Sequence, residues 1–187
     1  MKNPYKDDYS FTPRLNAKGR IVDDICYVGE YYILPFDKKQ KNKTAIINFC
    51  FAIVLFALQI LNGCLNQDSS RTAWIVFPYF MIYIPMAYFF MGASTYAQSP
   101  LKMQKAHFER GMERMRRSCY GILIFTSLSA ILDIVYMILH ASVMQVGREA
   151  LYFVLHIVII AVVLVFGKSY DHMYGGLYTE ASENRLI

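Results

Sequence analysis

The chain has 187 residues and a net charge of +5, and its composition is 56% hydrophobic but only 18% charged. A typical soluble domain is about 45–50% apolar and about 25% charged. The composition excludes a disordered chain, because so much apolar surface has to be buried, and four cysteines argue against a disulfide-rich scaffold. It also argues against an ordinary soluble enzyme, and membrane-spanning segments explain the apolar excess.

Residues 1–43 form a polar arm with nine lysines and arginines and six acids. Residues 21–36 of this arm are rich in β-branched and aromatic side chains around Gly29 and Glu30, which predicts a small β-hairpin with its turn there. An isolated two-stranded hairpin is only marginally stable in water. We therefore expect the arm either to dock on the bundle, the membrane or a partner, or to lie as a leader on the lipid headgroups.

Four apolar segments follow the arm, and each is about long enough to cross a hydrocarbon core of about 30 Å. They carry no charge or a single ionisable side chain, and they lie at about residues 44–65, 73–91, 119–140 and 150–166. The sequence therefore predicts an all-α integral membrane protein, with a four-helix transmembrane bundle over residues 44–167 and a tail at 168–187. The arm lacks the features of a secretory signal, so we expect the first span to be an uncleaved anchor.

The positive charges are sorted along the chain. Only Arg71 and Arg148 lie in the short loops that link the first span to the second and the third to the fourth. The positive-inside rule then places both termini and the 93–118 loop in the cytoplasm of a cell membrane, which we expect to be a bacterial inner membrane. We expect contacts with anionic lipids, rather than with nucleic acid, at Lys39, Lys41, Lys43, Arg114, Arg116 and Arg117.

Residues 100–118 predict a cytoplasmic amphipathic helix that continues into the third span. Ser99 and Pro100 form a typical helix start, in which a capping hydroxyl is followed by proline. Apolar side chains then recur every three or four residues, as on one helix face; this stripe includes Leu101, Phe108, Met112 and Met115. Such a stripe requires a partner, which we expect to be the arm, a second copy or another membrane protein, unless the helix lies flat on the lipid surface.

Four polar side chains are expected in one layer of the outer half of the bilayer: Asp133, His156, Gln59 and Asn62. Counted from the loop between the third and fourth spans, Asp133 and His156 lie at nearly equal depth in antiparallel neighbours, which predicts an Asp–His pair. Ionisable groups within a membrane are costly and pair in the bundle interior. The pair either binds a proton or cation on a transport path, serves as interhelical packing, or contacts a charged group of another subunit.

The sequence contains no catalytic, metal or cofactor motif, so we expect a non-catalytic protein without metal or cofactor. The favoured interpretation is an accessory, assembly or regulatory subunit of a larger membrane complex, because of the small bundle, the unpartnered stripe and the aromatic arm. The alternative is a small oligomeric transporter or channel for protons, ions or a small solute. It would use Asp133, His156 and the second span, in which Pro78 and Pro85 are expected to kink the helix.

Overall fold

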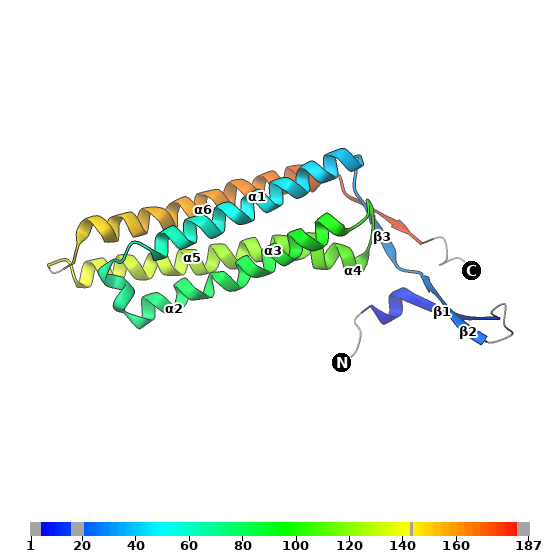
Figure 1. The fold of residues 1–187 in the computed structure, drawn as a ribbon, viewed down its shortest axis with the longest axis horizontal. Coiled ribbons are helices and arrows are strands. Elements are labelled where there is room, and N and C mark those ends of the chain that lie inside the picture. Colours follow the sequence, from blue (N-terminus) through cyan, green and yellow to red (C-terminus); the bar gives the residue numbers. More distant parts are fainter. Residues whose placement is uncertain (1–4, 16–20, 143, 183–187) are drawn as a thin grey trace.

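A computed structural model describes residues 5–15, 21–142 and 144–182 of the protein. Within this part, four helical segments are long and apolar enough to cross a membrane: Lys38–Gly63, Ala73–Gln98, Lys105–Leu139 and Val146–Tyr174. They run side by side as an elongated bundle, and the strands gather beyond one end of it (Figure 1). The four predicted segments are confirmed as helices long and apolar enough to span a membrane, and every helical segment is longer than its apolar stretch.

The helices of the bundle form a closed ring. Helix α1 (Lys38–Gly63) contacts both α3 (Tyr83–Gln98) and α6 (Val146–Tyr174), and α5 (Arg114–Leu139) contacts the same two helices. The first span begins where Asp37 caps α1 by accepting a hydrogen bond from the backbone N–H of Gln40, 2.8 Å away.

Aromatic rings fill the middle of the bundle. The ring of Phe51 on α1 stacks on that of Phe166 on α6 at a centroid distance of 3.8 Å. The edge of the Phe89 ring on α3 completes the cluster at 5.1 Å from Phe51. Three of the four spanning segments are thus joined by one group of rings, and such contacts add to the stability gained from burying their area.

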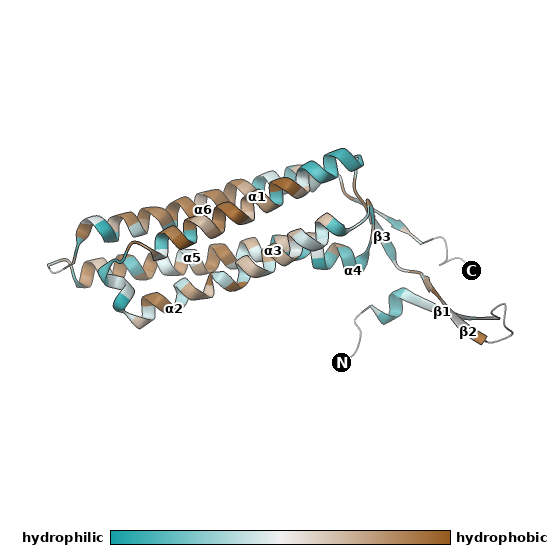
Figure 2. Cartoon of the chain, viewed as in Figure 1, coloured by the Kyte–Doolittle hydropathy of each residue, from teal (hydrophilic) through white to brown (hydrophobic). Residues whose placement is uncertain are grey.

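Large apolar side chains also cover the outside of the bundle. Ile53, Ile124 and Val165, from three different helices, are 64%, 64% and 67% exposed. Figure 2 shows the hydrophobic colour along the middle of the helices and hydrophilic residues toward the strand end. A soluble protein rarely exposes apolar surface on this scale, whereas lipid chains accommodate it.

The second span is interrupted where proline removes a backbone donor. Helix α2 (Ala73–Met81) ends four residues before Pro85, and α3 resumes at Tyr83 after Ile82. Pro85 has no N–H to offer the carbonyl group of Met81, which is the ordinary cause of a break in a helix.

The third segment begins differently from the prediction. Instead of starting a helix, Ser99 ends α3: its hydroxyl donates to the carbonyl oxygen of Tyr96 at 2.8 Å. Residues Lys102–Gln104 then form strand β4, and the helix starts at Lys105. The chain reverses direction here. The backbone N–H and C=O groups of Lys102–Gln104 pair with a neighbouring strand, and a helix beginning at Pro100 would not allow that pairing.

From Lys105 onward the predicted helical extension is present as one continuous segment with a wide turn. It consists of α4 (Lys105–Phe108), the π-helical turn η3 (Glu109–Glu113) and α5, together 35 residues. The extension packs against α3 within the bundle. It therefore neither projects freely from the bundle nor lies flat beside it as a separate helix.

The arm contains a β-hairpin, as predicted, but with different strands. The hairpin pairs β1 (Tyr9–Leu15) with β2 (Ile21–Tyr27), following the short 3₁₀ turn η1 (Lys6–Asp8). Strand β3 (Glu30–Ile33) does not fold back on β2 at Gly29. It is the central strand of a second antiparallel sheet of order β4-β3-β5, in which β5 (Tyr178–Ala181) follows α6.

The predicted turn at Gly29 is therefore a junction between two sheets, and Tyr27 holds it together. The Tyr27 hydroxyl donates to the carbonyl oxygen of Glu30 at 2.8 Å and accepts from the backbone N–H of Lys105 at 3.1 Å. Burial raises the pKa of Tyr27, so the hydroxyl keeps its proton at neutral pH and retains both bonds.

Two glycines set the closest approach between α3 and the third segment. A Cβ atom added at Gly92 would lie 2.9 Å from the carbonyl oxygen of Gly111, and one added at Gly111 would lie 3.3 Å from the backbone nitrogen of Tyr96. Glycine has a low intrinsic helix propensity, but here its missing side chain allows two backbones to touch.

Gly92→Ala is expected to lower the free energy of unfolding by about 1–3 kcal/mol, because the new methyl group collides with backbone atoms of Gly111 and Met115 as well as with the Met115 side chain. Thermal unfolding of the detergent-solubilised protein measures the effect. Gly167→Ala is the matched control, since no atom lies within 4 Å of a Cβ at that position. Equal melting temperatures for the two variants would contradict the close approach.

Candidate functional site

The predicted polar layer lies inside the bundle, at the end opposite the strands. Gln59, Asn62, Asp133 and His156 are all 0% exposed. They belong to α1, α5 and α6, so three spanning segments contribute to the layer. The layer nevertheless divides into two groups of contacts, and among the described residues no hydrogen bond joins Asp133 to His156.

The first group surrounds His156. Its Nδ1 atom lies 2.9 Å from the carbonyl oxygen of Tyr152 and 3.1 Å from the side-chain nitrogen of Asn62 on α1. The Tyr152 hydroxyl in turn lies 3.5 Å from the hydroxyl of Ser129 on α5. This group joins α1, α5 and α6 through neutral hydrogen bonds, which is the arrangement of interhelical packing contacts.

The second group contains two carboxyl groups. Asp133 on α5 lies beside Glu149 on α6, and both are 0% exposed. Ser69, from the 3₁₀ turn η2 (Asp68–Arg71), completes the group: its backbone N–H donates to Oε1 of Glu149 at 2.8 Å. We call Asp133, Glu149 and Ser69 the carboxyl cluster.

Most polar atoms of the carboxyl cluster have no hydrogen-bond partner in the protein. Both oxygens of Asp133, Oε2 of Glu149 and the hydroxyl of Ser69 are buried and unpartnered. Buried polar groups are normally satisfied, and each exception costs about 1–3 kcal/mol. Two adjacent carboxylates in a low-dielectric site also repel one another, so the cluster favours a proton or cation between them.

Two loops close over the carboxyl cluster. Asp68 in η2 accepts a hydrogen bond from the backbone N–H of Gln145 at 2.9 Å. The guanidinium group of Arg148 donates to the carbonyl oxygen of Asn66 at 3.3 Å. These contacts tie the connection between α1 and α2 to the connection between α5 and α6, and they position Ser69 above Glu149.

A cavity of about 180 Å³ lies beside the polar layer, between α2, α6 and the η2 loop. Tyr152 and Gln67 line it, and Gln67 is 3% exposed with its side-chain oxygen unpartnered. Liquid water occupies about 30 Å³ per molecule, so the cavity has room for several waters. Its lining is mainly apolar, and Gln67, Ser70 and the tyrosines contribute the polar groups next to the histidine group.

Gln59 takes no part in either group. Its side-chain nitrogen lies 3.4 Å from the carbonyl oxygen of Tyr79, and the Tyr79 hydroxyl donates to the carbonyl oxygen of Gln59 at 2.9 Å. This reciprocal pair joins α1 to the proline-containing helix α2.

Sequence reasoning missed Glu149 and Ser69 because it started the fourth helix too late. The prediction counted depth from Glu149, whereas α6 begins at Val146. Asp133 lies six residues inside the end of α5, while Glu149 and His156 lie three and ten residues inside the start of α6. At a rise of 1.5 Å per residue, the depth of Glu149 differs from that of Asp133 by about 4.5 Å, and the depth of His156 differs from that of Asp133 by about 6 Å. Glu149 is therefore the nearer of the two in depth.

One sequence signal could have revealed Glu149. It shares a helix face with Tyr152 and His156 at spacings of three and seven residues, and the buried face of α6 continues through Ile159 and Val163. An acid on the buried face of a span is a functional candidate. The sequence analysis instead placed Glu149 outside the fourth span, which it began at about residue 150.

The predicted partner-docking stripe packs inside the chain. Met112 and Met115 are 2% and 0% exposed, and Leu101 and Phe108 are partly buried against the main core. The Phe108 ring stacks on Tyr32 of β3 at a centroid distance of 4.1 Å. The stripe therefore has its packing partners within the chain, and it does not itself call for a second protein.

Among the predicted lipid contacts, Lys41 requires correction. It is 6% exposed, and its ammonium group donates to the carbonyl oxygens of Ala97 and Ser99. The last carbonyl groups of a helix attract a cation, and α3 ends directly beside Lys41. Lys39, Lys43, Arg116 and Arg117 remain exposed, and Arg114 is half-buried.

Within the described residues, no group of three or more histidine, cysteine, aspartate or glutamate side chains could hold a metal ion. The carboxyl cluster offers two carboxylates and one hydroxyl instead. That donor set suits a proton or a small cation that prefers oxygen.

Asn62→Ala is expected to lower the free energy of unfolding by about 1–2 kcal/mol, because it deprives the buried His156 ring of its contact with α1. Thermal unfolding in detergent is again the measurement. Asn42→Ala is the control, since Asn42 is exposed on the same helix. If both variants melt together with the wild type, the histidine group does not stabilise the bundle.

Comparison of the chain with protein families, with curated proteins and with solved structures finds no match. Its function is therefore argued from the site, since a bundle of four helices is compatible with many functions.

Proposed function

We propose that the protein is a small multi-pass transporter or channel that takes up a proton at the carboxyl cluster. The observation that carries this proposal is that both oxygens of Asp133 are buried without a partner beside the buried side chain of Glu149. One proton shared by the two groups removes their repulsion and supplies a hydrogen bond between them.

The orientation follows from the charge distribution. The basic segments lie at the strand end of the bundle, which the positive-inside rule assigns to the cytoplasm. The carboxyl cluster then lies near the opposite, external face, about 9 Å inside the end of α5. This depth supports a site that loads from outside through the η2 loop, where Ser69 contacts Glu149.

The inward part of the path would pass Tyr152 and His156. The Tyr152 hydroxyl lies 3.5 Å from the Ser129 hydroxyl, and the Tyr152 ring packs edge-on against the His156 ring at a centroid distance of 4.4 Å. Hydroxyl and imidazole groups both donate and accept, so such a series is able to pass a proton deeper into the bundle. The cavity beside Tyr152 and Gln67 supplies space for water along this route.

Proton flux into liposomes tests the proposal. We expect the reconstituted wild type to dissipate a pH gradient reported by a trapped pH-sensitive dye, and Asp133→Asn to reduce the rate to that of protein-free vesicles. The amide removes the titrating group while keeping the size of the side chain. A sodium gradient in place of the pH gradient distinguishes a cation from a proton.

Asp171→Asn is the matched control, because the same substitution then falls on an exposed carboxylate of α6 at the other end of the bundle. It should transport protons at the wild-type rate. Flux that persists unchanged in Asp133→Asn would overturn the carboxyl cluster as the site, and a wild type without any flux would overturn the transport function.

A second candidate is a subunit of a larger membrane complex, and the hairpin supports it. Phe11, Ile21 and Ile25 are 53%, 74% and 60% exposed, although the hairpin lies beyond the spanning helices. Phe11 and Ile25 stand directly opposite each other on β1 and β2. An apolar pair on an extramembrane hairpin is a suitable anchor for a protein partner.

The double substitution Phe11→Ser and Ile25→Ser tests the subunit function. We expect a protein that co-purifies stoichiometrically with the wild type to be lost from this variant, while the bundle remains folded. Tyr178→Ser is the control, because Tyr178 is 54% exposed on β5 in the other sheet. A wild type that purifies alone would exclude the subunit function without affecting the proton flux.

A further inference from the structure

A groove of about 480 Å³ opens between α3 and the third helical segment, near the strand end of the bundle. Its lining divides into two halves. One half is apolar and is formed by Ile84 and Pro85 of α3 and Phe125 of α5. The other half carries charge and is formed mainly by side chains of η3 and the first turns of α5.

Three arginines face the charged half: Arg110, Arg114 and Arg117. Their spacings of four and three residues place them along one face of the segment. Arg116 is different, because it lies 4.0 Å from Asp171 of α6 and lines other grooves. The cluster of arginines before the third span is thus divided between two sides of the helix.

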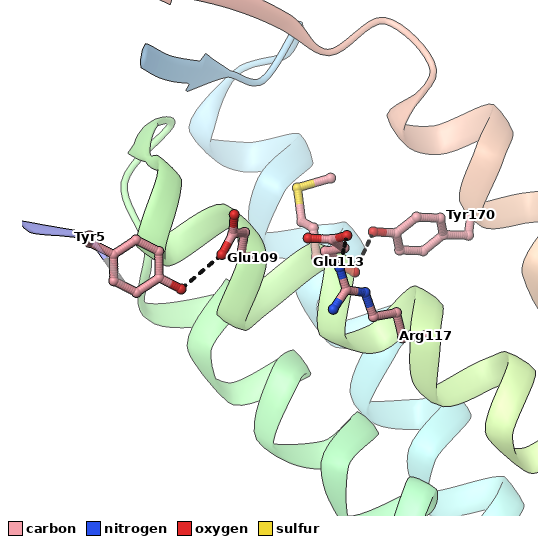
Figure 3. A network of polar contacts seen from close by, with 6 residues as sticks. Tyr5, Glu109, Glu113, Arg117 and Tyr170 are labelled. Atoms are coloured by element: carbon pink, nitrogen blue, oxygen red, sulfur yellow. Dashed lines mark hydrogen bonds and ion pairs between the residues drawn. The ribbon is translucent and has the colours of Figure 1, made fainter. Parts of the chain in front are cut away.

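The acids in this groove already have partners. Glu113 forms an ion pair with Arg117, and Glu109 accepts a hydrogen bond from the Tyr5 hydroxyl at 2.9 Å (Figure 3). Figure 3 also shows the hydrogen bond of 2.8 Å from Tyr170 to the backbone carbonyl of Met112, which holds this part of the segment against α6.

Arg114 has no acidic partner among the described residues, and its guanidinium group lies 5.8 Å from the ring centre of Tyr88. Arg110 lies 5.4 Å from the ring centre of Tyr5. Aromatic faces orient a guanidinium group without occupying its N–H donors in the ring plane. Within the part of the chain that the structure describes, neither Arg110 nor Arg114 forms an ion pair with a carboxylate, so the groove presents two arginines oriented by aromatic rings.

We infer that this groove binds the phosphate headgroup of an anionic phospholipid. Arg110 and Arg114 match a phosphate, because guanidinium groups bind phosphate oxygens through paired hydrogen bonds. The apolar half at Ile84, Pro85 and Phe125 matches the start of the acyl chains. No charged residue follows Arg117 in the chain until Asp133, so the boundary between the two halves coincides with the start of the apolar part of α5.

Counting bound lipids tests the inference. The protein is purified into phosphatidylcholine nanodiscs with a limiting amount of phosphatidylglycerol, and retained lipid is counted by native mass spectrometry. We expect the wild type to retain phosphatidylglycerol, and each of Arg110→Gln and Arg114→Gln to weaken retention about fivefold. Ile84→Trp, which fills the apolar half without changing charge, should also reduce retention.

Arg116→Gln is the matched control, because it removes the same charge from the same helix outside the groove. It should retain phosphatidylglycerol within about twofold of the wild type. An equal loss in Arg116→Gln would mean general attraction to the membrane surface and would overturn a specific site. Displacement of the lipid by millimolar inorganic phosphate would also overturn it, since a free phosphate would then suffice.

Discussion

Hydrocarbon solvates neither charged groups nor unpaired backbone groups, and most of this structure follows from that constraint. The outer faces of the spanning helices carry isoleucine, leucine, valine and aromatic side chains. The polar and ionisable side chains within the spanning helices, among them Asn62, Asp133 and His156, are buried in the bundle interior. The histidine group and the carboxyl cluster both result from that confinement.

The broad architecture could be predicted because each part had a local signal. Four apolar stretches indicated four helices able to span a membrane, and the β-branched arm indicated a hairpin. Of the two prolines expected to kink the second span, Pro85 follows the interruption at Ile82, whereas Pro78 lies within α2. The pairing of the strands was harder to predict from the sequence. Strand β3 pairs with β4 and β5, which lie about 70 and 150 residues away in sequence, and no local pattern records such partners.

The prediction of which residues meet in the site was sensitive to small errors in the predicted helix boundaries. The fourth span was predicted to start at about residue 150, four residues after the observed start of α6 at Val146, and His156 rather than Glu149 was therefore expected beside Asp133. Lys41 is a second case, because its place among the lysines just before the first span predicted a lipid contact. Its ammonium group donates hydrogen bonds to carbonyl oxygens at the end of α3. This contact depends on how α1 and α3 pack together, which no local sequence pattern records.

Packing alone is a poor explanation for the carboxyl cluster. The histidine group already joins α1, α5 and α6 by hydrogen-bond contacts. Asp133 and Glu149 add three unpartnered oxygens at the same end of the bundle, and leucine at either position would remove the cost of burying them. Buried oxygens that lower stability are better explained by what they bind. In the proposed function, a shared proton supplies the missing bond and gives the cluster two states, occupied and empty, which a transport site requires.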